Sequence, residues 1–172
     1  MKRINIFSIA FLTLFALGII LGFLGYYDTI YALDRANAWL NRAETAGFAE
    51  EMITYINKAL PLIPKSGNPV WIFPTSRTDF ELINRDLQDI LNRAEIIKNL
   101  AKNSDAYQQG MDDLRDKLKT MQSQIGEAAT FLYLSPLNII LGFAWLILIA
   151  LTGLYWLRKS RKQEVQEEAL KP

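Results

Sequence analysis

Two long runs without a charged residue constrain this chain more than any other feature of its sequence. Residues 4–27 and residues 137–157 contain no Asp, Glu, Lys or Arg and are rich in Leu, Ile and Phe. A bilayer core of about 30 Å needs about 20 apolar residues, because a helix rises about 1.5 Å per residue. We therefore predict transmembrane helices over residues 4–27 and 136–157.

A cleaved signal peptide is the alternative interpretation of the first run. Lys2 and Arg3 precede it, and the small residues near Ala16 and Gly18 offer a cleavage site. The apolar core of a signal peptide has about 7–15 residues, whereas this run continues to Tyr27. We therefore expect the run to remain in the protein as a span.

Basic residues cluster just beyond the outer ends of the two runs. Residues 1–3 include two, and the stretch from Arg158 to Lys162 includes four. Residues 28–135 carry fifteen acidic against twelve basic side chains. Lys and Arg close to a span resist translocation. We therefore expect a multi-pass protein of the cell (plasma) membrane, with both termini in the cytoplasm and the middle outside.

The ends of the chain are accordingly expected to be cytoplasmic tails. Residues 1–3 form the first and residues 158–172 the second, which is charged throughout. The basic side chains from Arg158 to Lys162 are expected to stop translocation and to contact anionic lipid headgroups.

The middle segment has helical spacing that begins without a break at the membrane edge. The first span is therefore expected to continue outward as one rod, which Gly47 ends as a C-cap. A second amphipathic stretch follows, from Phe48 to Ile63. Four prolines then exclude a continuous helix over residues 61–77, which we predict to be an ordered connector.

Two apolar seams follow the connector. Thr78 and Glu81 have the spacing of a capping box that starts the next helix. The first seam comprises Phe80, Ile83, Leu87, Ile90, Ala94, Ile97 and Ala101. The second comprises Tyr107, Met111, Leu114, Leu118, Met121, Ile125, Ala128 and Leu132. The seams are out of phase, so residues 79–134 form either two helices that turn near Ser104 or one helix with a three-residue shift.

The predicted fold class is an all-α membrane protein in which two transmembrane helices bracket an extracytoplasmic helical bundle. A four-helix arrangement is favoured, and a long helical hairpin is the alternative. The arms of such a hairpin, residues 28–61 and 79–135, would reach about 50 Å and 85 Å. This mismatch would leave the tip of the longer arm unsupported.

The residue inventory argues against an enzyme. The chain has no Cys and no His, which excludes thiolate nucleophiles, disulfides and histidine-based metal sites. Asp112 and Asp116 share one helix face, but Arg115, Lys117 and Lys119 interleave with them, so a solvated face is expected there. The middle segment has no basic stripe for nucleic acid. We predict no cofactor, no metal and no nucleic-acid partner.

Two groups of residues are candidates for binding a partner. Gly18 and Gly22 form a GxxxG pattern that Gly25 extends, and such a face lets another helix approach closely, either the second span or a partner. The other group is Val70, Trp71, Ile72 and Phe73, an apolar tetrad within the connector. These four side chains are expected to contact a partner subunit, to enter the membrane interface, or to fold back onto their own helices.

These features favour a non-catalytic accessory or structural subunit whose partners are other integral membrane subunits. The alternative is an extracytoplasmic bundle that senses a ligand. Two spans flanking four outer helices resemble the sensing modules of chemoreceptors and sensor kinases in architecture. Only fifteen residues follow Leu157, so we expect such a sensor to signal through a partner membrane protein.

Overall fold

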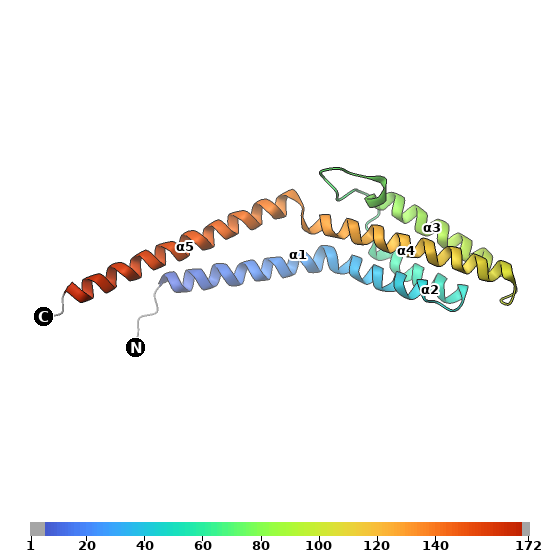
Figure 1. The fold of residues 1–172 in the computed structure, drawn as a ribbon, viewed down its shortest axis with the longest axis horizontal. Helices are drawn as coiled ribbons and strands as arrows, with labels where there is room; N and C mark the ends of the chain where they lie inside the picture. Colours follow the sequence, from blue (N-terminus) through green and yellow to red (C-terminus); the bar gives the residue numbers. More distant parts are fainter. Residues whose placement is uncertain (1–5, 170–172) are drawn as a thin grey trace. The chain divides into compact units, whose positions relative to one another are not determined.

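The structure is a computed structural model that describes residues 6–169, and all of their regular structure is helical. Figure 1 shows the order of the elements along the chain. The chain divides into two compact units. The apolar unit comprises Met1–Leu24 with Pro136–Pro172, and the core unit comprises Gly25–Ser135. The predicted tail of residues 1–3 lies outside the described residues, as do residues 170–172.

Two helices supply the predicted spans. Helix α1 runs over Ile6–Glu44 and helix α5 over Pro136–Ala169. Within them, Ser8–Tyr27 and Pro136–Lys159 are long and apolar enough to cross a membrane. The second of these windows begins at Pro136. Proline suits the first position of a helix, because the backbone N–H that it lacks would have no partner within the helix there. Helix α1 continues past Tyr27 without a break, as the periodicity of the sequence predicted.

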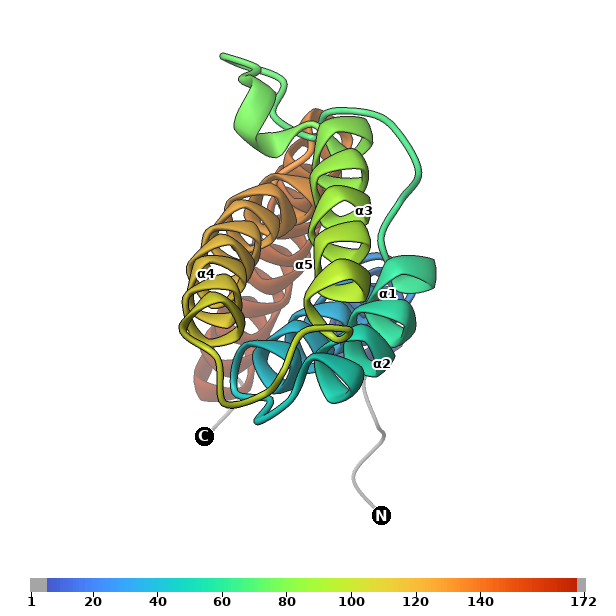
Figure 2. The same ribbon diagram turned by 90° about the vertical axis from the view of Figure 1, so that its right-hand side faces the viewer.

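The core unit contains the remaining elements. They are α2 (Ala49–Ala59), the short 3₁₀ helices η1 (Leu60–Leu62) and η2 (Ser76–Thr78), α3 (Phe80–Ile97) and α4 (Asp105–Tyr133). Helix α3 packs on both α2 and α4, and Figure 2 views these helices from their ends. The last turns of α1 complete the unit.

One hydrophobic core joins four helical segments. From α1 it takes Leu33, Ala36, Leu40 and Ala43, and from α2 it takes Met52, Ile56 and Ala59. Ala46, Ala49 and Ile63 also belong to it. The predicted seams supply Phe80, Ile83, Leu87, Ile90 and Ala94 on α3, and the seam residues from Tyr107 to Ala128 on α4. Helical spacing therefore identified the buried faces of α3 and α4 correctly.

The chain turns between the two seams. Helix α3 ends at Ile97, and Ser104 caps α4 by accepting a hydrogen bond from the Tyr107 amide at 3.2 Å. Residues 79–134 are thus two helices, because the turn brings both seams to the same core without a shift of register. Ala101 was predicted on the first seam but is exposed, since the helix has already ended.

Two predicted helix caps are wrong. Helix α1 ends at Glu44, and Gly47 does not have the positive φ of a C-cap glycine. It instead precedes α2, and its amide donates to the Glu51 carboxylate at 3.3 Å. At α3, the N-cap is Asp79, whose carboxylate accepts from the Glu81 amide at 2.9 Å.

Thr78 is not available as a cap because its hydroxyl serves the connector. It is buried, and it donates to the Asn68 side-chain oxygen at 3.0 Å. Gly67, at φ +101°, has the left-handed conformation that glycine adopts at low cost. Its carbonyl accepts from the Phe80 amide at 3.0 Å, which joins the connector to the start of α3.

Candidate functional site

The glycine face of α1 contacts α5 at its first glycine. A Cβ atom added to Gly18 would lie 2.2 Å from Cε2 of Trp145, so no larger residue fits without displacing the indole. The Trp145 ring also lies 6.5 Å from the ring of Phe15. The indole Nε1 donates to the backbone carbonyl of Leu14 at 2.9 Å. This contact joins α1 and α5 at Gly18, the first residue of the GxxxG pattern.

Gly22 and Gly25 continue the face but have open space. A Cβ atom added to either residue would meet no atom within 4 Å. The structure therefore places Gly18 in a helix contact and leaves the other two glycines accessible.

Trp145 makes a helix contact that the sequence analysis did not identify. An indole N–H in an apolar span needs an acceptor, and the nearest acceptors there are main-chain carbonyls of a neighbouring helix. An indole within a charge-free run therefore indicates that some acceptor lies nearby, but it does not indicate which residue supplies it.

The apolar tetrad of the connector is split between inside and outside. Val70 is buried, with 8% of its surface exposed, whereas Trp71 is 46%, Ile72 52% and Phe73 81% exposed. We call these three exposed residues the loop tip. The Trp71 indole donates to the Leu134 carbonyl at 2.9 Å, at the end of α4. Figure 1 shows the connector beside that end.

Asn68 holds the base of this loop. Its side-chain nitrogen donates to the Thr75 carbonyl at 2.7 Å, and its oxygen accepts from the Val70 amide at 3.0 Å. Arg77, at the end of the connector, pairs with Glu127 of α4 at 2.9 Å. The loop tip is thus presented by an internally bonded loop rather than by a free segment.

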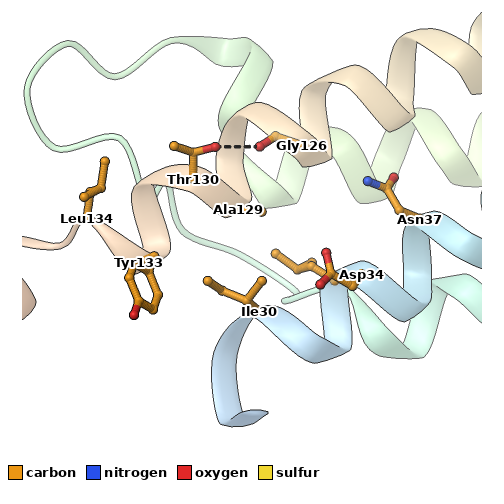
Figure 3. A pocket seen from close by; sticks show the side chains of 9 residues that line it. Ile30, Asp34, Asn37, Gly126, Ala129, Thr130, Tyr133 and Leu134 are labelled. Carbon is orange, nitrogen blue, oxygen red and sulfur yellow. Dashed lines mark hydrogen bonds between the residues drawn. The ribbon is translucent and has the colours of Figure 1, made fainter. Parts of the chain in front are cut away.

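A pocket of about 500 Å³ lies between α1 and α4 (Figure 3). Its lining comprises Ile30, Leu33, Asp34, Asn37, Gly126, Ala129, Thr130, Tyr133 and Leu134. The Asp34 carboxylate accepts from the Tyr26 hydroxyl at 2.7 Å. Among the described residues, the Asn37 side-chain oxygen is a buried polar atom without a hydrogen-bond partner. The pocket therefore combines apolar side chains with four polar ones, and the Asn37 oxygen among them has no donor.

The acidic stretch of α4 is occupied by ion pairs. Asp112 pairs with Arg115 at 2.8 Å, and Asp113 pairs with both Arg93 and Lys117, at 2.9 and 3.1 Å. Over residues 6–169, no group of three or more acidic side chains is placed to hold a metal ion. These ion pairs agree with the solvated face that was expected at Asp112 and Asp116.

Polar contacts also close the end of the core unit where α1 turns into α2. Arg115 donates to the Ala46 carbonyl at 2.9 Å, and the buried Tyr107 hydroxyl accepts from the Ala49 amide at 3.0 Å. Nearby, Lys102 pairs with Glu50 at 3.1 Å. The Glu50 pKa is lowered, first by its own backbone amide and then by Lys102. These contacts hold the junction of α1 and α2 against α4 and the turn that precedes it.

The fold defines a class: an all-helical protein with two helices long and apolar enough to span a membrane. Comparison of the chain with protein-family models, curated proteins and solved structures finds no match. The function is therefore argued from the chemistry of these surfaces.

Proposed function

We propose that this chain is a non-catalytic accessory or structural subunit of a larger membrane protein complex. Its two spans lie in the plasma membrane with both termini in the cytoplasm, and the core unit lies outside as a four-helix bundle. Helices of other integral membrane subunits pack on its spans. The basic residues after the second span and the acidic excess of residues 28–135 support this orientation.

The open glycine face carries the proposal. Gly18 already packs against Trp145, while a Cβ atom added to Gly22 or Gly25, on the same small-residue face, would meet no atom within 4 Å. Apolar side chains gain little by leaving lipid for another helix, whereas a glycine face gains van der Waals contact through close backbone approach. Since α5 contacts this face only at Gly18, the surface at Gly22 and Gly25 has room for a helix of a partner subunit.

Site-specific photocrosslinking in native membranes tests this proposal. A photoreactive residue at Gly22 should form one dominant adduct with another membrane polypeptide, at a yield near stoichiometric. The control is Gly142, on α5, where an added Cβ also meets no atom within 4 Å. Reaction with lipid alone at both positions, with the chain purifying by itself in mild detergent, contradicts the proposal.

The pocket between α1 and α4 favours a second function, an outer bundle that senses a ligand and signals through a partner membrane protein. Its support is the buried Asn37 oxygen, because a buried acceptor without a donor costs stability unless a ligand or water satisfies it. A ligand with an apolar body and a hydrogen-bond donor fits this lining.

A ligand screen separates the two functions. Binding to the folded state raises the melting temperature by mass action. An amphiphile with a donor group should raise the melting temperature of the purified chain, and Asn37→Leu should abolish the shift. An equal shift in the wild type and in Asn37→Leu contradicts a role for this pocket.

A further inference from the structure

The loop tip is the largest exposed apolar feature of the connector. Phe73 is 81% and Ile72 52% exposed, and no acidic residue occurs in residues 61–77, which include Lys65 and Arg77. Exposed apolar side chains grouped on one loop are typical of a surface that binds a membrane or another protein. The position of the loop indicates which of the two it contacts.

The hydrogen bond from Trp71 to Leu134 gives that position. Leu134 lies two residues before Pro136, where the second apolar window begins. That window has 24 residues, so as a helix it measures about 36 Å, more than the hydrocarbon thickness of about 30 Å. Its ends therefore reach the headgroup region. One residue separates Leu134 from Pro136, so the Leu134 carbonyl and the Trp71 nitrogen bonded to it lie within about 10 Å of the start of that window.

The surrounding residues have the composition of a membrane interface. Tyr133 and Leu134 are exposed at the end of α4, and Tyr26 and Tyr27 end the first apolar window. Tyr and Trp concentrate at headgroup level, where the ring is apolar and the polar atom remains hydrated or bonded. Trp71 adds to this group from a distant part of the chain.

The loop presents its tip in a defined conformation. Asn68 bridges Thr75 and Val70, and Val70 is buried beneath the tip. Little conformational freedom is then lost when the tip enters a lipid surface, because the loop is already closed by its own hydrogen bonds.

We propose that Trp71, Ile72 and Phe73 insert into the headgroup–acyl boundary of the bilayer on the side of the core unit. The loop tip is thus a third, non-spanning membrane contact, and its partner is the lipid surface rather than a protein. This inference rests on α5 crossing the bilayer and is independent of the complex proposed above.

The absence of cysteine allows a direct test on the full chain. Phe73→Cys carries an environment-sensitive fluorophore, and the protein is placed in phosphatidylcholine nanodiscs. A minor fraction of the lipid carries a nitroxide near the headgroup, and iodide serves as the aqueous quencher. We expect emission at residue 73 to shift to the blue, to be quenched by the lipid nitroxide and to resist iodide.

Two labelled controls bracket the result. Leu100→Cys places the label on another exposed apolar loop residue, at the opposite end of α4, whose 29 residues extend about 43 Å. This label should be quenched by iodide and not by lipid. Ile147→Cys places the label within the second span, where lipid nitroxide should quench it. Labels at residues 73 and 147 are expected to behave alike, and both unlike residue 100.

Each other outcome overturns a defined part of the inference. Lipid quenching at residue 147 but not at residue 73 overturns the membrane contact of the loop tip, including the case in which residue 73 is shielded from iodide by protein. Lack of lipid quenching at residue 147 overturns the span and the inference with it.

Trp71→Phe removes the hydrogen bond to Leu134. We expect this variant to reduce lipid quenching of the label at residue 73. Unchanged quenching overturns the role of that hydrogen bond.

Discussion

The Trp145 indole of α5 donates a hydrogen bond of 2.9 Å to the Leu14 carbonyl of α1, and its ring occupies the space that a Gly18 side chain would need. One tryptophan thus meets two requirements of packing between apolar helices, a satisfied polar atom and close backbone approach. The relationship also allows a matched pair of glycine substitutions.

Gly18→Ala is expected to weaken packing between α1 and α5 by about 1–3 kcal/mol, the usual cost of overpacking. Gly22→Ala should change it by less than about 0.5 kcal/mol, because its Cβ meets nothing within 4 Å. Unfolding in mixed detergent micelles measures both. In a Trp145→Leu background the cost of Gly18→Ala should largely disappear. Equal costs for the two glycines would show that Trp145 does not limit the approach.

Tyr107→Phe should destabilise the core unit by about 1–3 kcal/mol. The Tyr107 hydroxyl accepts from the Ala49 amide at 3.0 Å, and both residues are buried, so the substitution leaves a buried donor unsatisfied. Thermal unfolding of the full chain measures the loss, and hydrogen exchange of the Ala49 amide should accelerate. Tyr55→Phe is the control, since Tyr55 is half-buried and its ring stacks on Trp39. Comparable losses in the two variants would contradict the assigned role of the hydroxyl.

Asn37→Leu should raise the stability of the ligand-free protein by about 1 kcal/mol. An apolar side chain of similar size removes a buried acceptor that has no donor and adds apolar contact within the pocket. Asn41→Leu, at an exposed position one turn further along α1, should change stability by less than about 0.5 kcal/mol. A loss of stability in Asn37→Leu would mean that the amide is satisfied in solution.

The Glu50 carboxyl should titrate below the ordinary glutamate pKa of about 4.3. Because folding lowers this pKa, the stabilisation is present above about pH 4.3 and is lost as the pH falls through the folded value. Carboxyl-carbon NMR of the full chain measures the titration. Lys102→Ala should raise the pKa clearly and Lys98→Ala less, since Lys102 also bonds the carboxylate. An unchanged value in Lys102→Ala would contradict the ion pair.

Local sequence patterns predicted the features that depend on the hydropathy of each residue alone. The charge-free runs predicted both apolar helices, since length and hydropathy alone decide whether a helix can span a bilayer. Seams from Phe80 to Ala94 and from Tyr107 to Ala128 predicted the buried faces of α3 and α4, because helical spacing puts such residues on one side.

Tertiary structure decided what depends on a distant partner. Thr78 lost its predicted capping role because Asn68 binds its hydroxyl, and Asp79 then caps α3. Trp145 contacts Leu14, and Trp71 contacts Leu134, across separations that no local pattern encodes. A hydrogen-bonding side chain takes the partner that folding brings within reach, so its role follows from the packed structure and not from its neighbours in the sequence.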